Sequence, residues 1–172
     1  MRKQLNWTAP AFETPKEILK LWRDAGAKGN GLAKAWEKKA KAQGKEFLDV
    51  VSGNLPKNWN KDLVKLKESA LKEKPSVATR KASNMCLEAI VPNLPNIIGG
   101  SADLSGPNMT MTKFSKTITA KDYSGNNVEY GIREHAMGAM MNGMALHGGV
   151  IPFGGTFLVF SDYLRPAMRL AS

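Results

Sequence analysis

The chain has 172 residues, 42 % of them hydrophobic and 23 % charged, a composition typical of one globular domain with or without an extension. No apolar run reaches the roughly 18 residues of a membrane-spanning helix, and the basic start, Met1–Trp7, is not followed by an apolar core. We therefore expect neither a membrane protein nor a signal peptide. The single cysteine, Cys86, excludes an internal disulfide and suits a reducing compartment, so we expect a cytoplasmic protein.

The net charge of +10 is concentrated in the N-terminal part of the chain. Residues 1–76 hold 17 Lys and Arg against 9 Asp and Glu, whereas residues 77–172 hold 8 against 6. A basic segment raises nucleic acid as a partner. These lysines, however, alternate with acids and leucines at helical spacing, and no zinc-ligand or RNA-binding motif accompanies them. The pattern favours a solvated helix face, so we expect no nucleic-acid partner.

Residues 1–76 predict helices joined by short turns. Thr-Pro-Lys-Glu at 14–17 is typical of a capping box, and the glycines at 26–31 predict a break before a second helix over 32–43. A third helical segment starts at Pro56 and stops at Pro75. The four tryptophans are expected to anchor packing; they are Trp7, Trp22, Trp36 and Trp59. We interpret residues 1–76 as a helical, basic linker.

Residues 77–172 predict strands that alternate with helices. The expected elements are a helix over 77–91, a strand over 96–99, a loop over 101–122, a strand over 128–132, a helix over 133–146, a strand over 150–153 and a helix over 158–170. This alternation predicts an α/β fold, a parallel sheet with helices on both faces. Ligands of such sheets bind beyond the carboxyl ends of the strands.

Glu134 is the leading candidate for chemistry. It follows a predicted strand directly and lies in the first turn of a helix, where the helix dipole stabilises a carboxylate. The simplest interpretation is a helix-start acid, but Gly131 and Gly138 leave room beside it for another backbone or a ligand. The two histidines, His135 and His147, lack metal-ligand spacing, so no metal site is predicted.

Three aromatic residues follow the last predicted strand. Phe157, Phe160 and Tyr163 are three apart, so on a helix they share one face. Such a stripe is usually core, but here it follows a Gly-Gly pair at a strand end. A carboxylate together with an aromatic wall is what a flat, protonatable heteroaromatic ring requires, so the sequence points to a cofactor. A second glycine pair, at 99–100, predicts a tight loop after its strand, with Asp103 as a turn residue or a site residue.

The chain resembles the transketolases over essentially its whole length. The segments that carry the resemblance are Arg-Lys-Ala-Ser at 80–83, Gly-Gly-Ser-Ala-Asp-Leu at 99–104, Tyr-Gly-Ile-Arg-Glu-His-Ala-Met-Gly at 130–138, His-Gly-Gly at 147–149 and Gly-Thr-Phe-Leu-Val-Phe-Ser-Asp-Tyr at 155–163. Residues 1–76 are similar to the linker between the family's two cofactor domains. Residues 77–172 resemble the start of its pyrimidine-binding domain, an incomplete thiamine-diphosphate-binding fold.

The resemblance implies roles for individual residues. Glu134 matches the glutamate that hydrogen-bonds N1′ of the aminopyrimidine of thiamine diphosphate and favours the tautomer that removes the thiazolium C2 proton. Asp103 matches an aspartate near the thiazolium, and Arg80 matches an arginine that binds the substrate phosphate. The aromatic pocket around the pyrimidine is matched by Phe157, Phe160 and Tyr163. The implied reaction transfers a two-carbon glycolaldehyde unit from a ketose phosphate to an aldose phosphate.

One position departs from the family pattern. A serine that binds the substrate phosphate is commonly found where this chain has Pro107, and proline offers neither a hydroxyl nor an amide hydrogen. Ser105 or the amide of Gly106 is the candidate to replace it. The Gly-Asp-Gly and Asn pattern expected for Mg²⁺ and the diphosphate is absent; the family supplies it from the preceding domain of the other subunit of a homodimer.

We therefore expect the chain alone to be an inactive part of a transketolase. Two alternative enzymes share many of these motifs, dihydroxyacetone synthase and, less favoured, deoxyxylulose-phosphate synthase. A third alternative is a non-catalytic domain whose basic linker binds polyanions.

Overall fold

The computed structural model describes all 172 residues, which form two compact units, Met1–Leu48 and Asp49–Ser172. The first unit contains helices α1 (Lys16–Ala27) and α2 (Asn30–Ala42) and most of α3 (Lys45–Val51). The predicted capping box does not form, because Pro15 takes the cap position of α1 with an extended ψ of 138°. Thr14 therefore lies one residue too early to cap the first turn, and α1 has no side-chain cap.

The prediction that the tryptophans anchor packing is wrong for Trp22 and Trp36 of the first unit. Trp22 and Trp36 are 73 % and 55 % exposed, and among the residues of α1 and α2 only Ala40 is buried. Narrow apolar stripes on single helices bury little surface unless a second apolar face covers them. Trp59, in the second unit, does pack against a core cluster.

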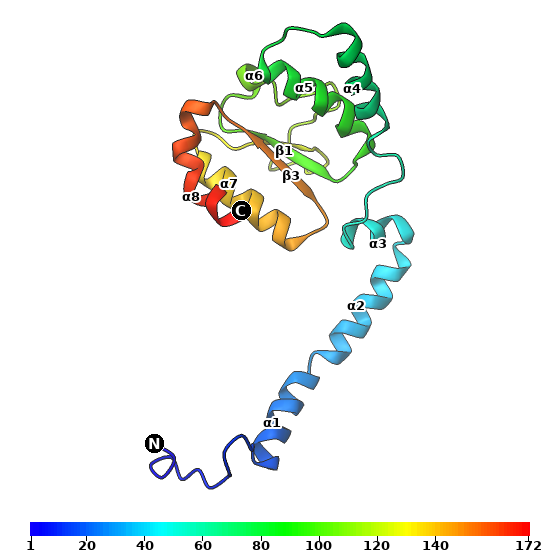
Figure 1. Ribbon diagram of the computed structural model, residues 1–172. Helices are drawn as coiled ribbons and strands as arrows, with labels where there is room; N and C mark the ends of the chain where they lie inside the picture. Colours follow the sequence, from blue (N-terminus) through cyan, green and yellow to red (C-terminus); the bar gives the residue numbers. More distant parts are fainter. The chain divides into compact units, whose positions relative to one another are not determined.

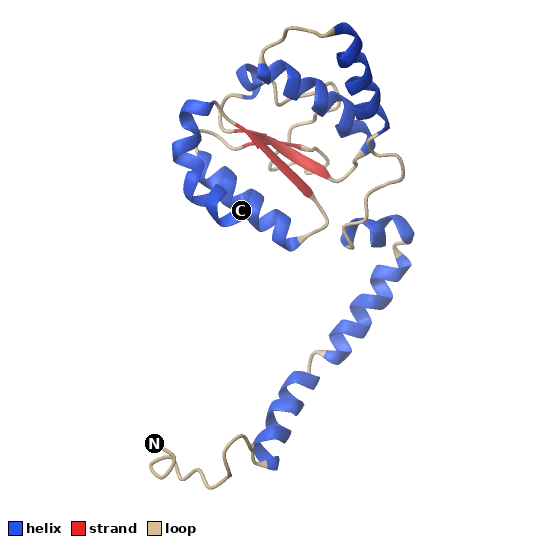
Figure 2. Ribbon diagram, in the orientation of Figure 1, coloured by secondary structure: helices blue, strands red, loops and turns tan.

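The second unit alternates helices and strands in the predicted order. Its elements are α4 (Lys61–Glu73), α5 (Thr79–Ile90), η1 (Val91–Asn93), β1 (Ile97–Ser101), α6 (Ser105–Asn108), β2 (Asn127–Glu129), α7 (Glu134–His147), β3 (Ile151–Gly155), η2 (Leu158–Phe160) and α8 (Ser161–Ala171). The short helix α6 lies inside the predicted loop, and the last predicted helix is divided into η2 and α8. Figure 2 shows the strands surrounded by helices.

The three strands form a parallel sheet in the order β2-β1-β3, which confirms the predicted sheet type. Gly99 and Gly100 lie within β1 rather than in the tight loop that the sequence predicted. Both are buried, and a Cβ atom would overlap the carbonyl oxygen of Phe153 at Gly99 and that of Val128 at Gly100. The glycine pair therefore permits close strand approach on both sides of β1.

Helices cover both faces of the sheet, as predicted. On one face Ile97 packs with Val91 and Leu94, next to α5 and η1. On the other face Ala102 packs with Tyr130 and Met137, the last of which lies on α7. Figure 1 shows α5 on one side of β1 and β3, and α7 and α8 on the other. Ile151 and Phe153, two residues apart on β3, both pack against the first cluster, as the alternation of side chains along a strand requires.

Residues 49–76 fold with the second unit, although the sequence grouped them with the linker. Helix α4 packs against α5, and Asn93 donates a 2.9 Å hydrogen bond to the carboxylate of Asp62. That bond, with a further one from Lys65, holds the pKa of Asp62 below its usual value. No helix of the structure is both long enough and apolar enough to span a membrane.

Candidate active site at the carboxyl edge of the sheet

The candidate residues gather where the parallel strands end. β1 ends at Ser101, β2 at Glu129 and β3 at Gly155, and parallel strands place these ends along one edge of the sheet. Asp103 follows the first end, Glu134 the second and Phe157 the third. This edge is where α/β sheets bind their ligands.

A tight turn sets Glu134 at the start of α7. Gly131 has a φ of +66°, which favours glycine, and the amide of Arg133 donates to its carbonyl at 2.7 Å. The Arg133 guanidinium folds back and donates to the carbonyl of Tyr130 at 3.0 Å. The chain thereby reverses from β2 into α7, which begins at Glu134.

Glu134 is largely buried, and its carboxylate has no partner within the chain. The residue is only 8 % exposed, yet its side chain makes no hydrogen bond or ion pair within the chain. Its position in the first helical turn supplies a favourable dipole. The carboxylate oxygens are still reached by solvent, so this group can accept a hydrogen bond from a ligand.

The three aromatic rings form a ladder. The rings of Phe157 and Phe160 are stacked with centroids 6.2 Å apart and planes 5° apart. The rings of Phe160 and Tyr163 have centroids 6.3 Å apart and planes 30° apart. The predicted shared face is confirmed, although Phe157 precedes η2 and only Tyr163 lies on α8. Tyr163 remains 63 % exposed, so the ladder is not a closed core stripe.

Close packing of α7 against α8 connects the helix that begins with Glu134 to the helix that bears Tyr163. Gly138 on α7 faces Leu164 and Ala167 on α8, and a Cβ atom at Gly138 would lie 2.9 Å from that of Ala167. Asn142 also donates a 2.9 Å hydrogen bond to the carbonyl of Ala167. The glycine therefore lets the two helices approach closely.

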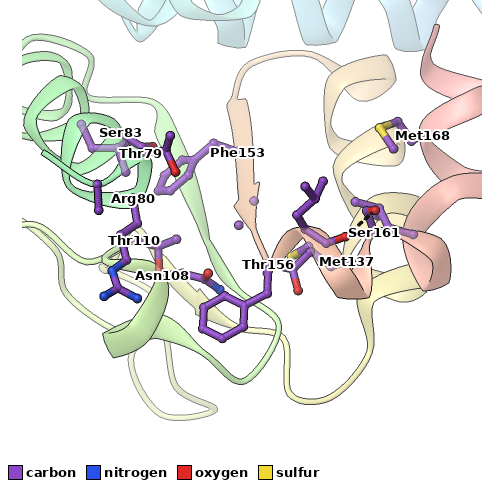
Figure 3. Close-up of a pocket in the computed structure, with 17 residues that line it drawn as sticks. Thr79, Arg80, Ser83, Asn108, Thr110, Met137, Phe153, Thr156, Ser161 and Met168 are labelled. Atoms are coloured by element: carbon purple, nitrogen blue, oxygen red, sulfur yellow. Dashed lines mark hydrogen bonds between the residues drawn. The ribbon is translucent and has the colours of Figure 1, made fainter.

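A cavity of about 820 Å³ lies at the same edge of the sheet, between the start of α5 and the segment from β3 to α8 (Figure 3). This volume falls within the range of small-molecule sites. Its lining residues are Ala78, Thr79, Arg80, Ser83, Leu87, Asn108, Thr110, Met137, Phe153, Gly154, Gly155, Thr156, Phe157, Leu158, Ser161, Leu164 and Met168. Of the sequence-predicted site residues, only Arg80 and Phe157 line it.

The other predicted residues lie outside the cavity. Asp103 is exposed with a φ of +62°, an uncommon backbone conformation for a residue other than glycine. The hydroxyl of Ser105 donates to the carboxylate of Glu129 at 3.2 Å, so an acid lies where a phosphate ligand was expected. Asp103 and Ser105 both follow β1, in its connection to β2.

Two threonines that the sequence reasoning did not single out line the cavity. Thr110 is 5 % exposed and Thr156 is partly buried, and neither hydroxyl has a hydrogen-bond partner. Thr156 directly precedes Phe157, in the segment from which the sequence analysis predicted the aromatic wall. Nothing in the sequence around Thr110 marks it, because its place in the cavity depends on how the segment after α6 folds back over β3.

The fold and this edge define a class, the parallel α/β domains that bind ligands beyond their strand ends. Residues 75–172 match the family model described as transketolase, pyrimidine binding domain, and the chain belongs to the transketolase family.

Curated relatives agree with this assignment. The chain is 42 % identical over 179 residues to the plasmid transketolase of Cupriavidus necator, covering 100 % of the chain and 26 % of that protein. It is 43 % identical over 178 residues to a transketolase of Vibrio vulnificus, covering 99 % and 27 %. The chain thus spans about a quarter of the length of these relatives.

Solved structures agree as well. Transketolase from Pichia stipitis in complex with sedoheptulose 7-phosphate superposes with a TM-score of 0.75 at 36 % identity, covering 94 % of the chain and 25 % of that structure. Transketolase from Leishmania mexicana gives a TM-score of 0.74 at 33 % identity, covering 94 % and 24 %. The fold predicted from the sequence resemblance is confirmed.

Proposed function

We propose that this chain forms the pyrimidine-binding half of a thiamine diphosphate site in a transketolase. The complete protein transfers a two-carbon glycolaldehyde unit from a ketose phosphate to an aldose phosphate. The observation that carries the proposal is Glu134, a largely buried residue whose carboxylate has no hydrogen-bond partner in the chain, at the start of a helix on the ligand-binding edge of the sheet.

The residues present fit the aminopyrimidine ring of the cofactor. Glu134 accepts a hydrogen bond from a protonated ring nitrogen and holds the proton at N1′. The ladder of Phe157, Phe160 and Tyr163 supplies aromatic faces for a flat ring. When bound, thiamine diphosphate supplies a thiazolium carbon that becomes a nucleophile after losing its proton.

Two further residues have proposed roles at the same edge. Asp103 lies after β1, on the central strand, and is assigned to the neighbourhood of the thiazolium. Arg80, the only charged residue that lines the cavity, binds the phosphate of the sugar substrate through its planar guanidinium.

The rest of the site belongs to parts of the protein that this chain does not contain. No group of three or more His, Cys, Asp or Glu side chains in the chain is arranged to hold a metal ion. We place Mg²⁺ and the diphosphate on the domain that precedes the linker in the longer relatives, supplied by the second subunit of a homodimer. We also infer that the protein is cytoplasmic, supported by its single, unpaired Cys86.

The chain alone is expected to be inactive because half of the cofactor site is missing. Purified chain mixed with thiamine diphosphate, Mg²⁺, xylulose 5-phosphate and ribose 5-phosphate should form no sedoheptulose 7-phosphate. With the complete parent protein, ribose 5-phosphate as acceptor should be preferred to formaldehyde, which separates this function from that of a dihydroxyacetone synthase. The named relatives are transketolases, so that alternative is not favoured.

The central test replaces Glu134 with Gln in the complete enzyme. The amide has the same shape but cannot hold the N1′ proton as a carboxylate does, so we expect kcat to fall about a hundredfold or more, with thiamine diphosphate binding little changed. Glu129→Gln is the matched control, since Glu129 is an exposed carboxylate at the same edge of the sheet. Equal kcat for Glu134→Gln and the unmodified enzyme contradicts the proposal.

A further inference from the structure

One face of α5 is attached to the connection that follows β1. Arg80 and Asn84 are four residues apart on this helix and therefore share a face. Nδ2 of Asn84 donates two hydrogen bonds of 3.0 Å, one to the carbonyl oxygen of Met109 and one to that of Met111. Asn84 is only 7 % exposed, so these bonds form where water competes poorly. The amide thus holds the backbone on both sides of Thr110.

The next turn of α5 supports the same attachment. Oε1 of Glu88 accepts a 2.9 Å hydrogen bond from the backbone amide of Lys113. Oδ1 of Asn84 accepts a longer one from Nζ of Lys81, at 3.4 Å. Asn84 therefore uses both of its N–H donors on the connection and its oxygen on a neighbour in the helix, which an apolar side chain of similar size cannot do.

The attached segment is also fixed at the ends of two strands. The amide of Thr110 donates to the carbonyl of Ser105 at 3.2 Å and closes the turn of α6. Nδ2 of Asn108 donates to Oγ of Ser101, the last residue of β1, at 2.8 Å. A Cβ atom at Gly155, the last residue of β3, would lie 2.6 Å from Cγ2 of Thr110. The connection is thus held at β1, at β3 and, through Asn84, at α5.

The two elements that Asn84 joins both border the cavity. Arg80 comes from α5, whereas Asn108 and Thr110 come from the connection (Figure 3). Asn84 itself does not line the cavity. Its two hydrogen bonds fix the distance between α5 and the connection, and with it the distance between Arg80 and the loop that bears Asp103.

We propose that Asn84 is a positioning residue that determines how well the complete enzyme uses phosphorylated acceptors. The inference rests on the proposed function, in which Arg80 binds the phosphate and Asp103 lies in the neighbourhood of the thiazolium. Asn84 acts through these two residues. By holding α5 at a fixed distance from the connection, it keeps the phosphate of an acceptor aligned with the end of the molecule that reacts.

The test compares erythrose 4-phosphate with erythrose as acceptors for the complete enzyme, with saturating xylulose 5-phosphate as donor. The two acceptors differ only in the phosphate, so the ratio of their kcat/KM values does not depend on how much of the enzyme is folded. Asn84→Leu keeps the approximate size of the side chain and removes both donors. The ratio of erythrose 4-phosphate to erythrose should fall about tenfold, since a small misplacement of a binding group is costly.

Asn93→Leu is the matched control. Nδ2 of Asn93 also donates two hydrogen bonds, to the carboxylate of Asp62 at 2.9 Å and to the carbonyl of Ala89 at 3.0 Å. Asn93 lies beyond the other end of α5 from Arg80. The control should unfold at a lower urea concentration, as Asn84→Leu should, but it should keep the ratio of the unmodified enzyme.

A second variant and a second measurement cover the case in which Asn84→Leu does not fold. Asn84→Asp keeps the shape and the contact with Lys81 but loses the donors at neutral pH, so the ratio should fall again. Hydrogen exchange of the complete protein, followed by mass spectrometry, reports the position of the segment directly. Residues 105–111 should exchange faster in the Asn84 variants than in Asn93→Leu.

An unchanged ratio in the Asn84 variants, an equal fall in Asn93→Leu, or unchanged exchange over residues 105–111 would each overturn the inference. These results are distinct from a failure of the proposed function. An unmodified enzyme that transfers no two-carbon unit to either acceptor would overturn the proposed function, and this inference with it. Transfer with an unchanged ratio would overturn the role of Asn84 alone.

Discussion

Asn142 on α7 donates a hydrogen bond from Nδ2 to the carbonyl oxygen of Ala167 on α8, at 2.9 Å. Ala167 is 2 % exposed, so the bond lies in a region that water reaches poorly. The two helices start near the proposed cofactor site, one with Glu134 and the other directly after Phe160. The Asn142 side chain thus connects α7, which begins with Glu134, to α8, which bears Tyr163.

Replacing Asn142 with Ala should loosen this connection. We expect the free energy of unfolding to fall by about 1 kcal/mol, the net value of a hydrogen bond. Urea unfolding followed by circular dichroism measures the change. Met140→Ala, on an exposed part of the same helix, is the control and should change stability by less. An unchanged urea midpoint in Asn142→Ala would show that the bond contributes nothing.

Gly138 and Gly143 form a matched pair on α7. A Cβ atom at Gly138 would overlap Leu164 and lie 2.9 Å from the Cβ of Ala167, whereas a Cβ atom at Gly143 meets nothing within 4 Å. Gly138→Ala should therefore destabilise the fold by about 1–3 kcal/mol through overpacking. Gly143→Ala should stabilise it by about 0.5–1 kcal/mol through helix propensity. Thermal unfolding of both variants checks the sign, and a shift in the same direction for both contradicts this packing.

Tyr130 has a buried hydroxyl without a hydrogen-bond partner, and burial raises the pKa of this phenol above its usual 10.0. Because the folded state favours the protonated form, its contribution to stability is complete below pH 10 and is lost as the pH rises further. Tyr130→Phe should unfold at an equal or higher urea concentration at pH 7, since it removes an unsatisfied group. It should also lose less stability than the unmodified chain between pH 9 and pH 11. Parallel pH profiles for the two proteins would argue against a buried, unpartnered phenol.

Phe160 is the middle ring of the aromatic ladder and is stacked with both Phe157 and Tyr163. Phe160→Leu in the complete enzyme should raise the dissociation constant for thiamine diphosphate about threefold to tenfold, as expected for one aromatic contact. Phe114→Leu is the control, because Phe114 is 44 % exposed and its ring contacts Lys113 instead. Calorimetric titration with thiamine diphosphate measures the affinity of both variants. Equal affinities of the Phe160→Leu and Phe114→Leu variants would show that the ladder is not part of the cofactor site.

The local pattern of the sequence predicted the alternation of strands and helices, and with it the edge that holds the site. Glu134 was found this way because a helix start after a strand is a local feature, determined by Gly131 and by the loss of strand pairing after Glu129. The aromatic spacing was likewise local, and the rings do stack. The resemblance of the same segments to family motifs suggested the cofactor and the role proposed for each residue.

Several features depended on contacts between residues distant in the sequence. By local pattern alone, Gly99 and Gly100 predict a loop. In the structure they belong to the central strand, where they lie close to the carbonyl oxygens of Phe153 and Val128 on the neighbouring strands. Trp59 joins the second unit because Val91, Leu94 and Ile97 offer it a core. No local pattern encodes such pairings.

The sequence alone therefore determined the order of helices and strands, the position of Glu134 at a helix start and the face that the three aromatic rings share. Each of these follows from the spacing of residue types over a few positions, which reflects the periodicity of a helix or a strand. What only the tertiary structure decided is which side chains line one cavity. Thr79, Thr110 and Phe157 meet there because β1 and β3 pair and α5 covers one face of the sheet, and burial is a property of the assembled fold rather than of any segment.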